Sequence, residues 1–529
     1  MTQTPVLLRP DVVVEPLVGR WYAWTHLISP ATAAMNVAFR HLRLMESFLD
    51  APDLHASAAA NPALRGGPFL DLPATAVDGI RALVDETRAR QAPAIAFGEA
   101  LRDAVRMVVE RADGHAMEPL YPALPDPVRG FVELIYTIGG APDLRVIEPL
   151  LYRSPVYDPS VQGAMIHSTA SDLRAFSLST PRLRRADAVE LERPFADGAY
   201  DLLARLRTRP QPVGAVMDGL GLSGADAALF RDFLVEAPAP VPPPPAAGAT
   251  RWRYFGHACV LVEAPDGTNT LIDPIVAYEC GADPERFTLA DLPERIDYVL
   301  LTHNHQDHVL LETLLALRWK IGTIVVPAGG GGFADPSLKL ALQAAGFPRV
   351  VELDSLASTG HGDLRLTALP FLGEHSDLDI RTKAAWLVEA GGGTLLFAAD
   401  SNNLEPRLYD LLRPLVPRVD ALFIGMECAG APLSWLYGPL LPWPPERAKD
   451  QSRRLNGSDF PRAMQAIRSL GCDQVFVYAL GMEPWLKFIS SIEPDDGTPP
   501  MRNSSALVAA CEDMGIPAER LYGQAEGWL

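Results

Sequence analysis

The second half of the chain alternates short apolar runs with longer amphipathic stretches. Short apolar runs bounded by polar or turn-forming residues predict buried strands, and they recur at 259–263, 270–272, 298–301, 323–326, 350–353, 364–369, 384–388, 394–397, 421–424 and 474–478. Apolar residues at helical spacing predict helices over 310–317, 336–345, 461–470 and 504–514. Many short strands with interleaved helices predict an α/β fold of the layered αβ/βα sandwich type.

The first 236 residues follow a different pattern and contain no recognisable catalytic motif. Helical spacing of apolar residues predicts helices over 32–49, 76–90, 97–111, 198–206, 213–220 and 223–236. The run 145–151 looks strand-like, so we expect a helix-rich α+β domain with a small sheet over residues 1–236. The last three helices would also suit a helix-turn-helix, but the acidic charge balance favours plain helical packing.

A proline-rich stretch separates these two patterns. Residues 237–250 read Ala-Pro-Ala-Pro-Val-Pro-Pro-Pro-Pro-Ala-Ala-Gly-Ala-Thr. Because proline fixes φ and lacks an amide donor, the stretch can form neither a helix nor a central strand. We predict a semi-rigid linker between a first domain, 1–236, and a second domain, 251–529. A proline-rich docking ligand is the less favoured interpretation.

The most informative polar residues follow directly after the predicted strand 298–301. The sequence there is Thr302-His303-Asn304-His305-Gln306-Asp307-His308, and it holds three of the chain's eleven histidines. Alternation along an extended segment places residues 303, 305 and 307 on the same side. Three imidazoles and a carboxylate within six residues are a metal-binding set, so we predict a metal site here.

Three acidic residues close to the ends of later apolar runs are candidates for the remaining ligands: Glu374, Asp400 and Glu427. A strand that buries its body and presents an acid at its tip holds that acid rigidly. Each acid alone could equally be a surface residue or a helix cap, but together with the histidine loop they favour metal ligation. Glu374 and His375 are neighbours that alternate in direction, so the sequence leaves open which of the two faces the metal.

The HxHxDH motif at 303–308, followed by a later acid or histidine and by an aspartate at a strand end, resembles the metallo-β-lactamase superfamily. Gly256-His257-Ala258-Cys259-Val260-Leu261 and Ile272-Asp273-Pro274 look like the opening strands of that superfamily, with His257 structural and not a ligand. The resemblance implies the fold over about 251–490. It does not fix the function, because this fold hosts hydrolases, nucleases and oxygen-handling enzymes.

The chain departs from the zinc hydrolases of this superfamily in one respect. Those enzymes normally contribute a late histidine, whereas no histidine follows His375 here, and Glu427 is the best replacement. A set rich in carboxylates suits iron or manganese better than zinc. We therefore expect seven ligands, namely His303, His305, Asp307, His308, Glu374, Asp400 and Glu427, of which the acids Glu374, Asp400 and Glu427 are also the candidate catalytic residues.

The expected ligands divide between two iron ions. We place one iron on His303, His305 and Glu374. The other lies on Asp307, His308 and Glu427. Asp400 is the expected bridge, because one carboxylate can span two cations and carboxylate-bridged di-iron sites have this ligand balance.

This combination is similar to one family, the di-iron β-hydroxylases of nonribosomal peptide biosynthesis, of the chloramphenicol-pathway type. The resemblance is carried by Leu372-Gly373-Glu374-His375-Ser376-Asp377, Met426-Glu427-Cys428-Ala429-Gly430-Ala431-Pro432 and Gly481-Met482-Glu483-Pro484-Trp485. It implies an O2-dependent monooxygenase with a bridged pair of iron ions and an external electron donor. The substrate it implies is an amino acid held as a thioester on a synthetase carrier domain. It also implies that the first domain supports dimerisation and carrier docking.

The composition limits the classes of binding partner and the cellular compartment that we expect for this protein. A formal net charge of −19 argues against nucleic acid, which needs a basic surface. No apolar stretch is long enough to predict a membrane span, and the start of the chain lacks an export-signal pattern. Five scattered cysteines without a CxxC pair suggest free thiols in the cytoplasm.

Three rival functions would keep the same fold. A zinc-dependent hydrolase would use a metal-bound water as its nucleophile. An interaction protein would have lost its chemistry, which the near-complete ligand set disfavours. An oxygen-reducing flavodi-iron protein fits less well, since nothing after Ser490 is long enough to be a flavin domain.

Overall fold

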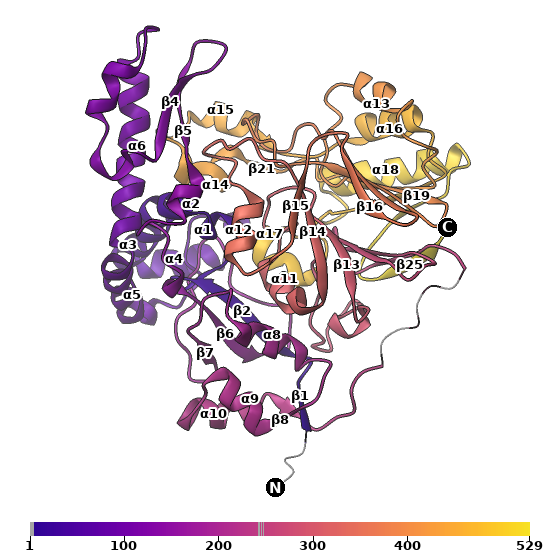
Figure 1. Cartoon of the computed structure of the whole chain (residues 1–529), viewed down its shortest axis with the longest axis horizontal. Coiled ribbons are helices and arrows are strands. Elements are labelled where there is room, and N and C mark those ends of the chain that lie inside the picture. The colour runs from indigo at the N-terminus through magenta and orange to yellow at the C-terminus, as the bar shows by residue number, and fades with distance from the viewer. Residues whose placement is uncertain (1–4, 242–243, 245, 247) are drawn as a thin grey trace.

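The structure is a computed structural model that describes residues 5–241, 244, 246 and 248–529. The first half of the chain forms a helical domain with small sheets, and the second half forms a sandwich of two larger sheets beside it (Figure 1). The linker predicted at 237–250 lies partly outside the described residues.

Two seven-stranded sheets form the sandwich, as the alternation of strands and helices predicts. The first has the order β15-β14-β13-β12-β11-β10-β25 and consists of β10 (Arg251–Tyr254), β11 (Val260–Glu263), β12 (Asn269–Ile272), β13 (Ile296–Leu300), β14 (Ile321–Pro327), β15 (Val350–Leu353) and β25 (Ala525–Trp528). The second has the order β16-β17-β18-β19-β20-β23-β24 and consists of β16 (Ser358–His361), β17 (Leu364–Leu369), β18 (Ala385–Ala390), β19 (Gly393–Phe397), β20 (Ala421–Gly425), β23 (Gln474–Tyr478) and β24 (Ala518–Arg520).

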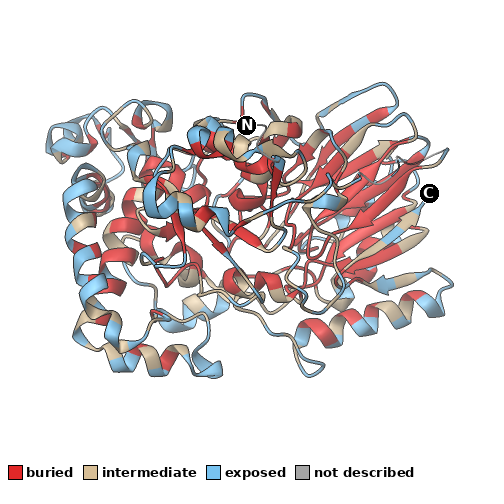
Figure 2. Ribbon diagram, turned by 90° about the horizontal axis from the view of Figure 1, so that it is seen from below, coloured by how far each residue is buried: buried red, intermediate tan, exposed pale blue. Residues whose placement is uncertain are grey.

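Each sheet is apolar on both faces, because one face meets the other sheet and the other face meets helices. Consecutive residues of β13 show this division. Leu300 belongs to the apolar cluster that includes Trp386 and Phe423, and Val299 belongs to a different cluster that includes α11 residue Leu314. Figure 2 shows the strands of the sandwich buried along most of their length. The helices of this half are α11 (Leu311–Leu317), α12 (Leu338–Ala344), α13 (Arg407–Leu412), α14 (Leu433–Tyr437), α15 (Arg447–Ser452), α16 (Phe460–Leu470), α17 (Lys487–Ser490) and α18 (Pro499–Asp513), and β21 (Ala431–Pro432) pairs with β22 (Arg454–Leu455).

The first half combines helices with three small sheets. The sheets have the orders β3-β2-β6-β7, β8-β1-β9 and β4-β5, with β1 at Pro5–Leu8, β2 at Val12–Val18, β3 at Trp21–Tyr22, β4 at Val132–Tyr136, β5 at Pro142–Val146, β6 at Gln162–Ser168, β7 at Val189–Leu191, β8 at Gln211–Pro212 and β9 at Leu234–Val235. The helices are α1 (Thr25–Ile28), α2 (Pro30–Asn36), α3 (Leu42–Asp50), α4 (Pro52–Ala59), α5 (Val77–Arg90), α6 (Ala92–Arg111), α7 (Glu148–Leu151), α8 (Gly198–Arg205), α9 (Val213–Leu220) and α10 (Gly224–Arg231). The upper end of α6 and the β4–β5 hairpin project away from the body of the molecule (Figure 1).

The ten strands predicted for the second half are all present, each within two residues of its expected ends. Three predictions in the first half need correction. The helix expected over 32–49 is interrupted by a π-helical turn at Val37–His41. The strand-like run 145–151 is the end of β5 followed by α7, because Pro149 lacks the amide that a strand ladder needs. The helix expected over 223–236 ends at Arg231, and β9 pairs with β1 instead.

None of the helices in the described part of the chain is both long enough and apolar enough to cross a membrane.

Candidate metal centre

The histidine loop begins where β13 ends, at the edge of the sandwich that faces the first domain. Asp273 fixes its start, since its carboxylate accepts hydrogen bonds from the amide of Thr302 at 2.8 Å and from the Thr302 hydroxyl at 2.6 Å. The chain then turns, because the carbonyl of His305 accepts from the amides of His308 (3.1 Å) and Val309 (2.8 Å). The sequence predicted an extended segment here and not a turn. The turn lets the adjacent Asp307 and His308 reach the same region.

The loop histidines and two of the predicted acids form tight groups. His303, His305 and Glu374 make one group, and His303, His308 and Asp400 make a second, each with potential ligand atoms within 4.8 Å of one another. His305 Nδ1 lies 2.8 Å from Glu374 Oε1, and His308 Nε2 lies 3.2 Å from Asp400 Oδ2. His303 Nε2 is 3.9 Å from both carboxylates. Asp400 therefore lies between His303 and His308.

Two buried atoms of the predicted ligands lack a hydrogen-bond partner. They are His303 Nε2 and Asp400 Oδ1, which have none among the described residues. Buried polar atoms are nearly always paired, because leaving them unpaired costs free energy. Their convergence at one point fits bound cations, and the mixture of imidazoles and carboxylates fits iron.

Neighbouring side chains orient the histidines toward this point. The Nδ1 of His308 lies 2.8 Å from Asp273 Oδ2, which leaves its Nε2 facing Asp400. The Nε2 of His305 lies 3.0 Å from the Tyr437 hydroxyl, which leaves its Nδ1 facing Glu374. Such outer partners fix both the tautomer and the ring orientation of a metal-binding histidine.

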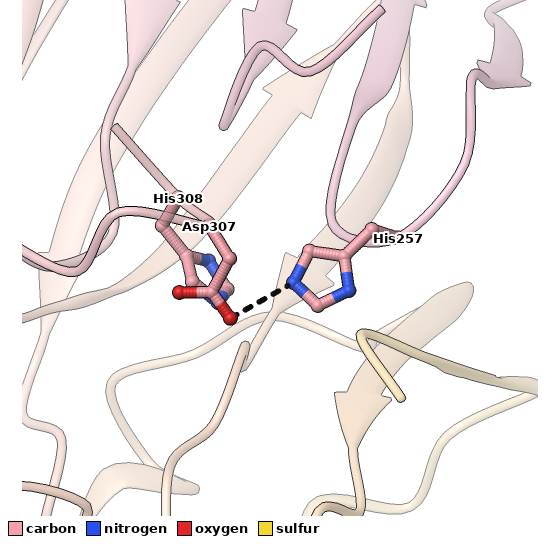
Figure 3. A group of neighbouring side chains, drawn as sticks. All are labelled: His257, Asp307 and His308. Atoms are coloured by element: carbon pink, nitrogen blue, oxygen red, sulfur yellow. Dashed lines mark ion pairs between the residues drawn. The ribbon is translucent and has the colours of Figure 1, made fainter. Parts of the chain in front are cut away.

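His257 lies beside Asp307, as Figure 3 shows. The Nδ1 of His257 accepts a hydrogen bond from the amide of Gly481 at 3.3 Å, so the neutral ring carries its proton on Nε2. That Nε2 lies 3.5 Å from Asp307 Oδ2. His257 also belongs to a third potential metal-binding group, with Asp307 and His308. The hydrogen bond from Gly481 suits it to orient Asp307, so the structural role expected from the sequence stays a prediction.

The charges of the centre follow from burial and from mutual contacts. Burial, reinforced by His308, holds the pKa of His303 well below its ordinary value. Burial alone would lower the pKa of His308, but the carboxylates of Asp400 and Asp273 raise it well above its ordinary value. Burial opposes ionisation of Glu374, yet the adjacent His305 holds its pKa well below the usual range. The acid is therefore ionised and able to bind a cation.

Glu427 lies on the wall of the same cavity as Asp307, Glu374 and Asp400, but it belongs to none of the three tight groups found among the described residues. Its Oε1 accepts hydrogen bonds from the amides of Ala429 (3.0 Å) and Gly430 (2.8 Å). Burial raises its pKa. Gly430 has φ +53°, and a Cβ there would meet the Leu455 carbonyl oxygen, so the turn that holds Glu427 requires glycine.

The remaining side chains singled out in the sequence take different positions. His375 Nδ1 lies 2.9 Å from Glu374 Oε2, beside the tight groups and outside them, which favours Glu374 as the ligand. Glu483 accepts a hydrogen bond from the Tyr254 hydroxyl.

Side chains of the first domain form hydrogen bonds with the histidine loop, and no sequence pattern predicted these contacts. The Thr25 hydroxyl donates to Asn304 Oδ1, and the Ser177 hydroxyl donates to Gln306 Oε1 at 3.1 Å. Asn304 and Gln306 are the polar residues between the predicted ligands. The first domain therefore helps to hold the metal loop in its conformation.

A cavity of about 750 Å³ opens from the centre and is walled by both halves of the chain. Its inner end is formed by His305, Gln306, Asp307, Glu374, Asp400 and Glu427. The first domain supplies residues 63–69 and Leu178, and the second supplies 429–432, 489–494 and 498–500 together with Trp435, Leu436, Gln451 and Leu455. The wall includes the exposed residues Arg65 and Glu493, which form an ion pair.

Comparisons with known proteins agree with this geometry. Residues 7–238 match the family described as "Diiron non-heme beta-hydroxylase N-terminal domain", and residues 268–431 match a β-lactamase superfamily domain. The 4-amino-L-phenylalanyl-[CmlP-peptidyl-carrier-protein] 3-hydroxylase of Streptomyces venezuelae is 40% identical, over 97% of this chain and 98% of its own length. The chain belongs to the di-iron β-hydroxylase family.

Solved structures support the same relation for this β-hydroxylase. The crystal structure of CmlA, a diiron beta-hydroxylase from Streptomyces venezuelae, superposes with a TM-score of 0.92 at 38% identity and covers all of both chains. A metal-dependent hydrolase of Anaeromyxobacter sp. strain K is 29% identical over only 31% of this chain and 61% of its own length. The family implies two iron ions, and the cluster of unpaired histidine and carboxylate atoms fits them.

The Tyr437 hydroxyl gives a direct test of how this β-hydroxylase orients His305. We expect Tyr437→Phe to keep the fold, because the ring is retained, and to weaken iron binding about 10- to 100-fold, as loss of an outer partner typically does. Competition with an iron chelator measures the affinity. Phe371→Leu, which contacts the same cluster without a hydrogen bond, is the control. Iron affinity equal to that of the unaltered protein would contradict this role.

Proposed function

We propose that this β-hydroxylase uses two iron ions and O2 to hydroxylate the β-carbon of an amino acid held as a thioester on a carrier domain of a nonribosomal peptide synthetase. The observation that carries the proposal is the carboxylate-rich centre at the inner end of a cavity built by both domains. The relative that is 40% identical is named for 3-hydroxylation of a carrier-bound amino acid.

The seven predicted ligands are proposed to divide as the sequence suggested. His303, His305 and Glu374 hold one iron, which their tight grouping supports. Asp307, His308 and Glu427 hold the other, and the position of Asp400 between His303 and His308 supports a bridging role. The iron pair, when bound, supplies the oxidation chemistry. The protein positions the substrate and excludes water, since both His303 and His308 are fully buried.

The cavity suits a tethered substrate. It leads from buried metal-binding side chains to a wall that includes the exposed Arg65 and Glu493, so an extended arm can reach the centre while its carrier stays outside. The cavity walls include small residues such as Gly66, Gly67 and Ala431, which leave room for the arm.

We also propose a homodimer and a cytoplasmic location. The projecting β4–β5 hairpin exposes Ile138 fully at its tip, which supports a role of the first domain in self-association. All five cysteines are free, which supports a reducing compartment. An external electron donor is required because one oxygen atom of O2 leaves as water.

The test uses the iron-loaded protein, a reductant, O2 and a carrier domain loaded with 4-amino-L-phenylalanine or other aromatic amino acids. We expect one oxygen atom from isotopically labelled O2 to appear on the β-carbon of a carrier-bound amino acid, detected by mass spectrometry. Release of the free amino acid without O2 consumption, in protein containing only zinc, would support the rival hydrolase and contradict the proposal.

A further inference from the structure

Gln306 has a different environment from the predicted ligands on either side of it. It is 5% exposed and lines the inner end of the cavity beside His305 and Asp307. Its Oε1 accepts a hydrogen bond from the Ser177 hydroxyl at 3.1 Å. Its Nε2 is buried and has no hydrogen-bond partner in the part of the chain that the structure describes.

Ser177 fixes which end of the amide is free. Its own amide donates to the carbonyl of Phe488 in the second domain at 2.8 Å, and this hydrogen bond holds the serine in place. Its hydroxyl donates a hydrogen bond to Gln306 Oε1. The two N–H groups of Gln306 then have no acceptor among the described residues. A buried donor left unpaired costs free energy, so this arrangement favours a ligand that brings an acceptor.

Other donors on the cavity wall are engaged, exposed or distant from the centre. The indole N–H of Trp435 donates to the Gly66 carbonyl at 3.0 Å, and Arg65 is paired with Glu493. Ser491 also has a buried hydroxyl without a partner among the described residues, but its neighbour is Gly66 of the first domain. Gln306 is therefore the unpaired donor adjacent to the predicted metal ligands.

We propose that Gln306 donates a hydrogen bond to the thioester carbonyl oxygen of the carrier-bound amino acid, with Ser177 positioning its amide. This inference rests on the proposed function and names how the site holds that substrate. The carbonyl carbon is two bonds from the β-carbon that reacts. A donor next to His305 and Asp307 in sequence and in the cavity can therefore hold the carbonyl while the β-carbon faces the metal centre.

Asn304 provides a matched control in the same loop. It is 4% exposed, its Oδ1 accepts from the Thr25 hydroxyl, and its Nδ2 is also unpaired among the described residues. It does not belong to the cavity wall. Asn304→Asp therefore places the same charge in the same loop as Gln306→Glu, without touching the substrate.

The experiment measures binding of loaded carriers to the anaerobic, reduced, iron-loaded protein by calorimetry. One carrier bears the aromatic amino acid through a stable amide in place of the thioester. A second bears it through a methylene, which has no carbonyl. We expect Gln306→Glu to weaken binding of the first carrier at least about tenfold relative to Asn304→Asp. The uncharged Gln306→Met is expected to weaken it about fivefold. Iron content and the optical spectrum of all three variants should match those of the unaltered protein.

The methylene carrier distinguishes loss of a contact with the carbonyl from a general disturbance of the binding site. We expect it to bind the unaltered protein and Gln306→Met alike. Equal affinity of the amide carrier for the unaltered protein, Gln306→Glu and Gln306→Met would overturn the inference, as would an equal loss with both carriers. If the unaltered protein binds no loaded carrier better than the empty one, the proposed function itself fails.

Discussion

Replacement of Asp400 by alanine is expected to lower hydroxylation at least about a hundredfold, because even the loss of an outer partner of a metal site costs 10- to 100-fold. Asp400 Oδ2 lies 3.2 Å from His308 Nε2 and 3.9 Å from His303 Nε2. The substitution therefore removes the carboxylate that lies between these two histidines. We expect no more than one iron ion per chain. Colorimetric iron analysis and the rate of product formation on a loaded carrier measure the two effects.

The matched control for this prediction is Asp379→Ala. Asp379 is 83% exposed and pairs with Arg381 at the surface, so its loss should change neither iron content nor rate. Asp400→Asn keeps the shape of the side chain and serves as a second variant in case Asp400→Ala does not fold. It should show the same loss of iron. Two iron ions per chain and an unchanged rate in both Asp400 variants would remove Asp400 from the centre.

Replacement of Arg174 by methionine is expected to destabilise the protein by about 3–5 kcal/mol, the usual cost of leaving one partner of a buried ion pair alone. Arg174 of the first domain donates to both carboxylate oxygens of Glu312, at 2.9 to 3.1 Å, and the Tyr22 hydroxyl donates to the same carboxylate at 2.8 Å. Glu312 lies in α11, which follows the metal loop. Denaturant titration of the iron-loaded protein measures the free energy of unfolding.

An exposed ion pair of the first domain shows how much of that effect depends on burial. Arg185 and Asp187 are both largely exposed, so Arg185→Met should cost less than about 1 kcal/mol. If Arg174→Met unfolds at the same denaturant concentration as Arg185→Met, the buried pair does not stabilise the contact between the domains.

The sandwich was predictable from the sequence because its central strands are continuous apolar runs. Strands such as β20 and β23 are buried on both faces and stand out by composition alone. The strands that were missed are short or polar. β16 reads Ser-Thr-Gly-His and β25 reads Ala-Glu-Gly-Trp, and both lie at sheet edges, where no apolar run is required.

The sequence predicted only those parts of the site that depend on local residue spacing and on the ends of strands. The HxHxDH spacing and the acids after β17, β19 and β20 identified side chains that the structure gathers around one cavity. The contacts between Thr25 and Asn304 and between Ser177 and Gln306 join residues far apart in the chain, and no local pattern reports them. The turn at His305 likewise depends on backbone hydrogen bonds that the side-chain pattern does not reveal.

The most direct test of the central claim is anomalous diffraction at the iron edge from crystals of protein purified without chelators. The account predicts two iron peaks about 3.5–4 Å apart. Asp400 should lie between them, and Glu427 should reach the iron bound by Asp307 and His308. A zinc signal without iron in this cavity, with Glu427 turned away from the metal, would contradict the account.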